Sequence, residues 1–307
     1  MQLKPIAAAV ILGAATGALA DYPEKPVQFI VPWPPGGAED ILTRFIADEF
    51  QEMYGVPAAV VNKPGGGGGP FPGAIEVSTA APDGYTIGSF VIDVPVVGPD
   101  LGIPELQPNP FDAVGTFMTY PFLIVAAEDA PYDTMQELAA HAQQNEVVLG
   151  HFGSALIPTR VTVELADTMG FEFGADAAFD NVDCNVLASG DVEVMNSIVS
   201  LVLPCLDELK VLATLTEERL PILPDVPTVK ELAPELDIVL WNGLFVPKDT
   251  PDEVVTKIEA AVQSALEKQE LIDYVAENGT PVYWRDRSAT DARITKDSKT
   301  YADIAIE

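Results

Sequence analysis

Short apolar runs alternate along the chain with longer stretches that repeat at helical spacing. Residues 27–31 are apolar without alternation, which is typical of a strand buried on both faces of a parallel sheet. Apolar positions then recur every three or four residues over 41–53, which predicts a helix that ends at Gly55. A second strand is predicted at 57–61. This order of strand, helix and strand predicts an α/β fold with a largely parallel sheet.

Strands are predicted farther along the chain at residues 85–92, 122–126, 146–150, 192–199, 210–215 and 238–247. The last run is long for a single strand and leads into another helical pattern, so it could carry the chain from one domain back to the other. We therefore expect two lobes. Residues 21–115 and 240–307 are assigned to lobe 1, and residues 116–239 to lobe 2.

Three predicted helices start with the same polar spacing. Thr134, Thr228 and Thr250 each precede a glutamate by three residues, which is the spacing of a capping box. Pro251 adds a proline suited to the first helical position. Caps stabilise helix ends, so we assign these residues no function.

The first twenty residues have the features of a targeting segment. They contain one lysine, an apolar stretch too short to cross a bilayer, and Ala-Leu-Ala directly before Asp21. This pattern predicts a secretory signal peptide over residues 1–20, so the mature chain would begin at Asp21 in the periplasm. No later stretch approaches the roughly 20 apolar residues of a membrane helix, and we expect a soluble protein after cleavage.

The formal charge is -31, and loss of Lys4 with the leader makes it -32 because the leader contains no acid. Nucleic acid and anionic lipid are therefore poor partners. The acids are scattered without a calcium-loop pattern, which favours a solvated acidic coat over a cation-binding surface. Cys184 and Cys205 are the only cysteines. Their spacing is compatible with a disulfide or with two buried thiols.

Few residues are suited to catalysis. The chain has two histidines, His141 and His151, and two distant cysteines, so no metal site is expected. A serine hydrolase would need Ser154 with His151 as its base, but the G-x-S-x-G context is absent. No P-loop or dinucleotide fingerprint occurs, so no cofactor is predicted. We do not expect an enzyme, and a secreted hydrolase is the least favoured alternative.

Two glycine-containing loops each lead into a predicted helix. The N–H groups of a first helical turn lack partners and carry partial positive charge, so they can hold a carboxylate without a basic side chain. An equally open alternative is that the first loop is only a tight turn, with Asp40 capping its own helix. The candidates in this loop are Trp33, Pro35, Gly36, Gly37, Ala38, Glu39 and Asp40.

The second loop follows the strand predicted to end at Gly150. Arg160 is a candidate carboxylate clamp in a chain with few bases, and an ion pair with Glu164 is the equally open alternative. If the two loops, one from each half of the chain, face each other across a cleft, they could bind an organic anion between them. The candidates in the second loop are His151, Phe152, Gly153, Ser154, Ala155, Thr159 and Arg160.

Five segments together carry a resemblance to a known family. They read YPEKPVQFIVPWPPGGAEDILTRFIADEF, VNKPGGGGG, APDGYTIG, LPDVPTVKEL and WNGLFVPKDTPDEVVTKIEAAV. In this order and spacing the chain resembles the periplasmic solute receptors of tripartite tricarboxylate transporters, the Bug or TctC-like family. The resemblance covers nearly the whole mature chain. It implies a type II periplasmic-binding-protein fold, with two α/β lobes and a ligand in the cleft, and delivery of that ligand to a membrane permease with a large and a small subunit.

The resemblance also implies roles for particular residues. The loops 34–40 and 150–159 would hold one ligand carboxylate, largely through backbone N–H groups. More variable segments would read the distal end of the ligand, here Ile92, Asp93, Phe179, Asp180 and Asn181.

Three departures from the family pattern bear on the ligand. Glu39 stands where a small or hydroxylic residue is usual, so it should turn outward or stay protonated. Arg160 stands where a histidine is frequent, and a basic residue is lost near 178–181. The gain of Glu39 and the lost base argue against a tricarboxylate.

The leading hypothesis is a monomeric periplasmic receptor that captures a small organic carboxylate by lobe closure. The alternative is a protein of the same fold that presents its ligand to a sensor kinase. The sequence does not separate these two, and the neighbouring genes would.

Overall fold

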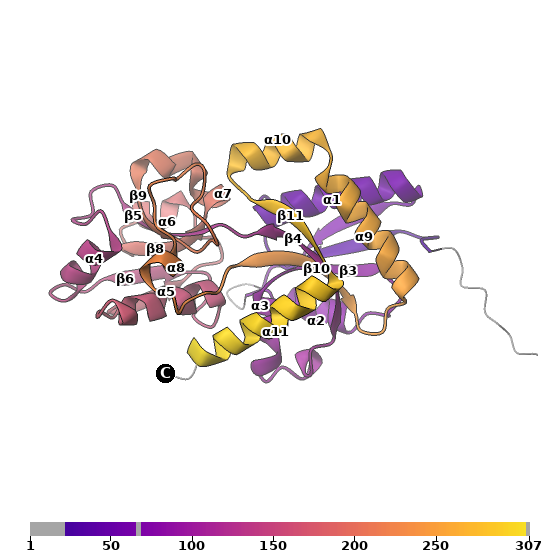
Figure 1. The fold of residues 1–307 in the computed structure, drawn as a ribbon, viewed down its shortest axis with the longest axis horizontal. Helices are drawn as coiled ribbons and strands as arrows, with labels where there is room; N and C mark the ends of the chain where they lie inside the picture. Colours follow the sequence, from indigo (N-terminus) through magenta and orange to yellow (C-terminus); the bar gives the residue numbers. More distant parts are fainter. Residues whose placement is uncertain (1–21, 66–68, 305–307) are drawn as a thin grey trace, which may run out of the picture.

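The protein is described by a computed structural model that covers residues 22–65 and 69–304. The chain forms two α/β lobes that lie side by side (Figure 1). The predicted two-lobed α/β fold is confirmed. The predicted signal peptide over 1–20 lies outside the described residues.

Lobe 1 is built on a sheet with the strand order β11-β4-β10-β3-β1-β2. Helix α1 packs against α9 and β2, and α11 packs against β4. The strands are β1 (Val27–Val31), β2 (Ala58–Asn62), β3 (Thr86–Val91), β4 (Phe111–Thr119), β10 (Trp241–Pro247) and β11 (Val282–Asp286). The helices are α1 (Ala38–Tyr54), α2 (Phe71–Ser78), α3 (Asp93–Val96), α9 (Asp252–Leu266), α10 (Gln269–Asn278) and α11 (Arg287–Ile304).

Lobe 2 is built on a sheet with the strand order β7-β6-β8-β5-β9. Its strands are β5 (Phe122–Ala127), β6 (Val148–His151), β7 (Ala175–Ala178), β8 (Val194–Ile198) and β9 (Leu209–Thr214). Its helices are α4 (Met135–Ala142), α5 (Ile157–Thr168), α6 (Cys184–Ala188), α7 (Val199–Val202) and α8 (Val229–Leu232).

Both sheets are mixed, whereas the sequence predicted largely parallel ones. β1 is parallel to β2 and β3, and β6 is parallel to β7 and β8. β10 and β5 are antiparallel to both of their neighbours. β5 is the first strand after the chain enters lobe 2, and β10 is the first strand after it returns to lobe 1. Each therefore runs in the direction opposite to its neighbours and pairs with them antiparallel.

The chain crosses between the lobes twice. It leaves the first sheet after Thr119 and enters the second at Phe122, and it returns between Thr214 and Trp241. The predicted bounds at 115/116 and 239/240 lie near these crossings and stay a prediction. The N–H of Tyr120 donates to the carbonyl of Leu240 at 2.9 Å, so the two crossings run side by side. Such paired crossings suit a hinge.

Two of the three predicted helix caps are present. Thr134 and Thr228 accept the N–H groups of Glu137 and Glu231, each at 3.2 Å. The prediction at Thr250 is wrong, because its hydroxyl donates to the carbonyl of Pro247 and helix α9 begins only at Asp252. Pro251 accordingly precedes that helix and does not occupy its first turn.

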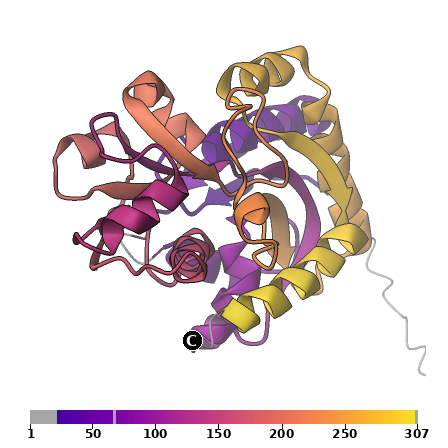
Figure 2. The same ribbon diagram turned by 60° about the vertical axis from the view of Figure 1, so that its left-hand side comes forward.

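The last helix joins the two lobes at their edge. α11 runs from lobe 1 toward the N-terminal start of α5 in lobe 2 (Figures 1 and 2). Near its end, the Tyr301 hydroxyl donates to the carbonyl of Ala155 at 3.3 Å. This contact ties the second glycine loop to lobe 1.

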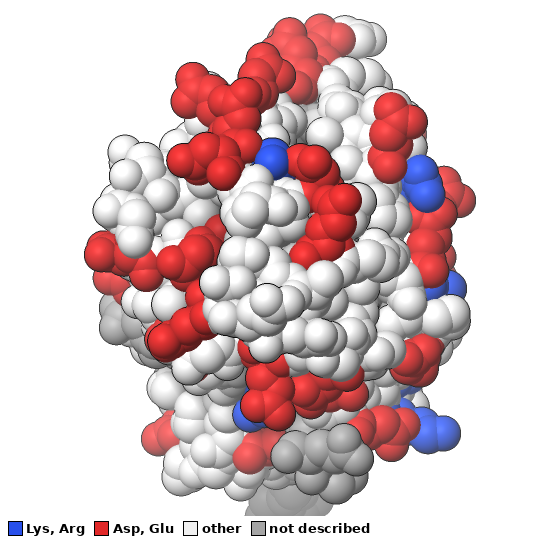
Figure 3. Space-filling view, turned by 90° about the vertical axis from the view of Figure 1, so that its left-hand side faces the viewer, with Lys and Arg blue, Asp and Glu red and all other residues white. Residues whose placement is uncertain are grey.

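Acidic side chains dominate the end of the molecule formed by lobe 2, with only isolated basic groups among them (Figure 3). In the described ranges, no group of three or more His, Cys, Asp or Glu side chains is placed to hold a metal ion. Nor does any helix of those ranges have the length and apolar character needed to cross a membrane. The acids therefore form a scattered surface coat over lobe 2.

Cys184 and Cys205 form a disulfide, one of the two alternatives that the sequence left open. The bond ties α6 to the 3-10 helix Leu203–Glu208, on either side of β8. It closes a loop with a sequence separation of 21 residues.

Reduction of this disulfide should destabilise the protein. A closed loop of this length restricts the unfolded chain, so its loss should lower the free energy of unfolding by about 3 kcal/mol. Urea unfolding with and without a thiol reductant measures the change. The double variant Cys184→Ser, Cys205→Ser should match the reduced protein and should no longer respond to reductant. Equal midpoints for the oxidised and reduced wild type would contradict the expectation.

Candidate functional site

A cavity of about 250 Å³ lies between the lobes beside the paired crossings. The loop after β1, the end of β3 and both crossings meet there with the loop after β6 and the end of β8. The lining residues are Trp33, Pro34, Pro35, Gly36, Gly37, Val91, Asp93, Tyr120, Phe122, Phe152, Leu156, Pro158, Asp180, Asn181, Ile198, Leu201 and Leu240.

The two predicted loops meet at this cavity, although only part of each lines it. The predicted site residues in its wall are Trp33, Pro35, Gly36, Gly37, Asp93, Phe152, Asp180 and Asn181. Phe179 lines an adjoining pocket together with Trp33 and Phe152. The predicted residues outside the wall are Ala38, Glu39, Asp40, Ile92, His151, Gly153, Ser154, Ala155, Thr159 and Arg160. The binding role of each residue stays a prediction.

Several apolar wall residues were not among the predicted candidates, although Leu156 and Pro158 lie within the predicted loop 150–159. The missed residues are Val91, Tyr120, Phe122, Leu156, Pro158, Ile198, Leu201 and Leu240. Most lie at strand ends, in the crossings or at a helix start, where their pattern resembles that of core residues. Tyr120 and Leu240 could have been found from the sequence, because they lie near the predicted lobe boundaries.

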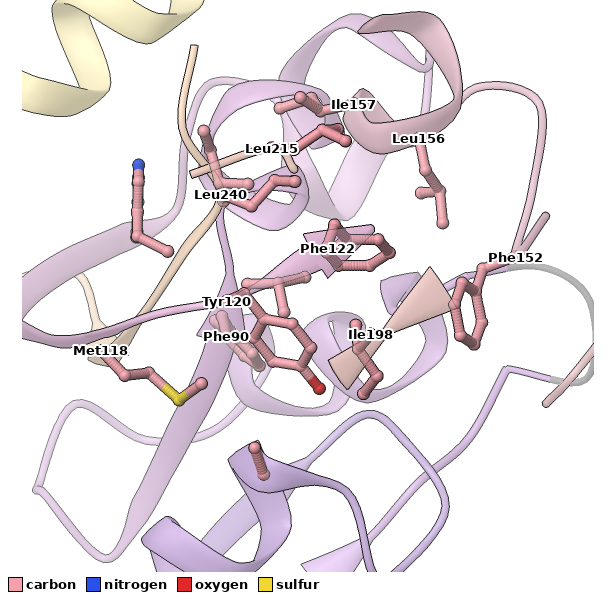
Figure 4. Close-up of a cluster of buried hydrophobic side chains, with 14 of the residues drawn as sticks. Phe90, Met118, Tyr120, Phe122, Phe152, Leu156, Ile157, Ile198, Leu215 and Leu240 are labelled. Atoms are coloured by element: carbon pink, nitrogen blue, oxygen red, sulfur yellow. The ribbon is translucent and has the colours of Figure 1, made fainter. Parts of the chain in front are cut away.

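Aromatic rings from both lobes form a continuous wall. The ring centroids of Trp33 and Phe152 are 5.9 Å apart, those of Phe152 and Phe122 are 5.9 Å apart, and those of Phe122 and Tyr120 are 5.6 Å apart. Figure 4 shows Tyr120, Phe122 and Phe152 around a common space with Ile198. The indole N–H of Trp33 is buried and has no hydrogen-bond partner in the part of the chain that the structure describes. The wall is thus apolar, with one unused donor.

The loop before α1 is held in place by Asp40. Its carboxylate accepts hydrogen bonds from the N–H of Gly36 at 2.9 Å, from the Arg44 guanidinium at 2.8 and 3.1 Å, and from the Asn62 amide at 2.9 Å. Burial raises the pKa of Asp40, but these hydrogen bonds outweigh it and lower the pKa below its usual value. Gly36 has a φ of 102°, which L side chains rarely adopt. The loop is thereby preorganised.

The start of α1 offers backbone donors to the cavity side. The first intrahelical bond runs from the N–H of Ile41 to the carbonyl of Gly37, so earlier N–H groups have no partner within the helix. The Tyr120 hydroxyl lies against this turn, 3.7 Å from the place that a Cβ on Gly37 would take. Burial raises the pKa of Tyr120 well above its usual value, so its hydroxyl stays protonated.

Glu39 is buried in the protein rather than turned outward. Its side chain is 1% exposed, and neither carboxylate oxygen has a hydrogen-bond partner among the described residues. Burial, and then the charge of Asp40, raise its pKa well above the usual value. Of the two expected ways to avoid repelling a carboxylate, the structure favours protonation.

The start of α5 is capped from the other lobe. Leu156 at its N-cap has no side chain able to accept a hydrogen bond. Instead, Oδ1 of Asp93 in lobe 1 accepts the N–H of Ile157 at 2.7 Å. Asp93 is 3% exposed, and burial raises the pKa of its carboxyl to about 7. An acid of one lobe therefore occupies a helix end of the other.

The remaining candidates of the second loop point elsewhere. His151 is buried with its Nε2 2.7 Å from Oδ2 of Asp176, so this nitrogen is engaged away from Ser154. Arg160 is exposed and lies near Tyr301 of α11, whose pKa it helps to lower against the raising effect of burial. Ser154 is also exposed. This arrangement gives no support to a serine nucleophile with His151 as base.

Two α/β lobes, paired crossings and a cavity between them define a ligand-binding protein of the periplasmic type. The model of the tripartite tricarboxylate transporter family receptor matches residues 42–306. The chain belongs to this receptor family.

Relatives and solved structures agree with this assignment. The chain is 28% identical over 289 residues to Protein BugT of Bordetella pertussis, covering 88% of this chain and 86% of that protein. It is similar to the periplasmic binding protein BugD, with a TM-score of 0.80 at 25% identity over 92% of this chain and 97% of that one. MatC from Rhodopseudomonas palustris, solved with bound malate, gives a TM-score of 0.78 at 25% identity over 92% of this chain and 99% of that one.

Replacement of Asp40 should release the first loop. Asp40→Ala leaves the donors of Gly36, Arg44 and Asn62 without their shared acceptor, so we expect a loss of roughly 2–3 kcal/mol of stability. Urea unfolding at pH 7 measures it. Asp48→Ala, on the exposed side of the same helix, is the matched control and should change little. Equal losses for both variants would argue against a special role of Asp40.

Replacement of Glu39 should change the pH dependence of stability. A carboxyl whose pKa is raised on folding contributes its stability below the unfolded value near 4.5, and that contribution is lost as pH rises through the folded pKa. Glu39→Gln has no titrating group at this position and so does not lose this stability. The free energy of unfolding of the variant minus that of the wild type should therefore be larger at pH 8 than at pH 5, by roughly 1–2 kcal/mol. Thermal unfolding at the two pH values measures the difference. Asp48→Asn is the control, and a difference that is the same at both pH values would contradict the expectation.

Proposed function

We propose that this receptor lies in the periplasm, binds a small organic carboxylate in the cavity between its lobes, and delivers it to the membrane subunits of a tripartite tricarboxylate transporter. The observation that carries this proposal is the preorganised turn at Gly36 and Gly37, which presents the start of α1 to a cavity lined by both lobes. MatC, a relative of the same fold, holds malate.

The first step of binding rests on backbone donors. The N–H groups at the start of α1 that have no partner within the helix carry partial positive charge and can donate to a carboxylate without a basic side chain. The Glu39 N–H among them already bonds the Tyr120 hydroxyl. Asp40 holds this turn in its binding geometry before the ligand arrives, so less ordering is needed on binding. The indole N–H of Trp33 is a further donor in the same loop.

The second step is closure of the lobes. A ligand that touches Trp33 of lobe 1 and Phe152 of lobe 2 stabilises the form in which these residues are close. The paired crossings at Tyr120 and Leu240 would absorb the rotation. The permease would then recognise the closed form.

The acidic coat does not prevent capture of an anion. Charges on the surface are screened beyond about 10 Å at roughly 0.1 M salt. Local N–H donors inside the cavity therefore decide the binding energy more than the net charge of the protein does.

Binding should be visible in the fluorescence of Trp33. Titration with dicarboxylates, tricarboxylates, aromatic acids and acidic amino acids should include at least one acid that gives a saturable change in emission. At 100 times its Kd, that acid should raise the free energy of unfolding by about 2.7 kcal/mol.

Trp33→Phe is the matched control, because Trp241 and Trp284 lie outside the cavity wall. The variant should lose most of the change in emission and keep part of the stabilisation by ligand, because the backbone donors at the start of α1 remain while the indole N–H is lost. Absence of any spectral or thermal change with the whole panel would contradict the proposed function.

A further inference from the structure

The charge balance of the cavity is unusual for a site that holds an anion. Its described wall contains two carboxyl groups, Asp93 and Asp180, and no lysine, arginine or histidine. The bases nearest in sequence to the first loop are engaged elsewhere, Arg44 with Asp40 and Lys25 with Asp83. A ligand with two carboxylates would bring further negative charge to this wall without a basic partner.

Asp93 is the more informative of the two acids. It is 3% exposed and lines the cavity, whereas Asp180 lies at the exposed side. No ion pair joins Asp93 to any basic side chain of the described ranges. Its bonds to the N–H groups of Ile157 and of Asp93 itself use two acceptor positions, and a carboxylate has about four. A buried carboxyl group is normally either paired with a cation or protonated, so a cation in the cavity would stabilise the ionised form of Asp93.

The rest of the wall suits a cationic group. Trp33, Tyr120, Phe122 and Phe152 present a connected set of aromatic rings to the cavity. Aromatic faces attract ammonium groups, by roughly 2 kcal/mol or more where water is excluded. Aromatic rings together with a buried carboxylate are the features expected of a site for a positively charged nitrogen.

We infer that the ligand is a zwitterion, with its carboxylate at the start of α1 and a cationic nitrogen between Asp93 and the aromatic wall. This inference rests on the proposed function and narrows its substrate class. The cation supplies the partner that Asp93 lacks, and the carboxylate uses the N–H groups of the first loop. A plain dicarboxylate satisfies only the second of these contacts.

Capping of α5 alone does not account for Asp93. The neutral side chain of Ser, Thr or Asn could accept the Ile157 N–H without burying an acid. The capping role and the cation-binding role make different predictions, because only the second depends on the charge of the ligand.

Matched pairs of ligands isolate that charge. Glycine betaine and 3,3-dimethylbutanoate have nearly the same shape and differ in the charge of the central atom, and L-phenylalanine and 3-phenylpropanoate differ by one ammonium group. Isothermal titration of the wild type at pH 7.5 should give, in at least one pair, about tenfold or more tighter binding of the zwitterion. The ammonium of L-phenylalanine can donate a charge-assisted hydrogen bond, which contributes roughly 1.5–3 kcal/mol. The trimethylammonium of glycine betaine has no N–H and would gain roughly 2 kcal/mol from the aromatic faces.

Asp93→Asn is the decisive variant, because the amide oxygen can still accept the Ile157 N–H. It should reduce the preference for the zwitterion to about threefold or less while changing the affinity for the anionic partner, which lacks the cationic centre, by less than about threefold. Asp93→Ser serves as a second variant if Asp93→Asn fails to fold, as judged by thermal unfolding. Asp129→Asn, remote from the cavity, is the matched control and should leave both affinities unchanged.

Two results would overturn the inference. One is a wild type that binds both anionic partners, which lack the cationic centre, as tightly as the zwitterions. The other is an Asp93→Asn variant that binds both members of a pair more weakly by the same factor. Binding of malate or adipate without binding of either zwitterion would overturn it and leave the proposed function intact. If no organic acid in the fluorescence panel binds, both the zwitterion inference and the proposed function are contradicted.

Discussion

The hydrogen bond from Tyr120 to Leu240 fixes where the two lobes meet, and the position of the site follows from it. The two crossings are 120 residues apart in sequence and become neighbours only through this backbone pairing. Tyr120 and Leu240 then contribute their side chains to the cavity wall. The residues that join the lobes are therefore also residues that a ligand would touch, which couples ligand binding to the relative position of the lobes.

Acidic side chains hold both helix ends, in two different ways. Asp40 acts within lobe 1, where it secures the turn before α1 and leaves the later N–H groups available. Asp93 acts between the lobes, where it accepts the first N–H of α5. The first contact should persist when the lobes separate, whereas the second depends on the closed arrangement. The sequence predicted that both helix ends would hold the anion. In the structure the two ends differ, because the start of α5 is occupied by Asp93.

The fold was predictable where the apolar pattern is strong and local. β1, β5 and β9 coincide with predicted runs to within one or two residues, because each has a continuous apolar stretch. β7 was missed because the sequence Ala-Asp-Ala-Ala is short and largely exposed at a sheet edge. β11 is likewise a half-exposed edge strand. Such strands exist through pairing with a neighbour, which a local pattern does not show.

The site was predictable only in its glycine loops, since helix-end chemistry depends on consecutive residues. Asp93 reaches Ile157 across 64 residues, and no local pattern indicates that contact. The contact between Asp93 and Ile157 matters for how this acidic protein could bind an organic acid. Burial raises the pKa of Glu39 well above its usual value, which favours its neutral form. Burial raises the pKa of Asp93 to about 7, so a nearby cation can favour its ionised form. A zwitterion would thus favour the charged form of Asp93, and that form binds the α5 helix end more strongly. Ligand binding and lobe closure would then stabilise each other through one carboxylate.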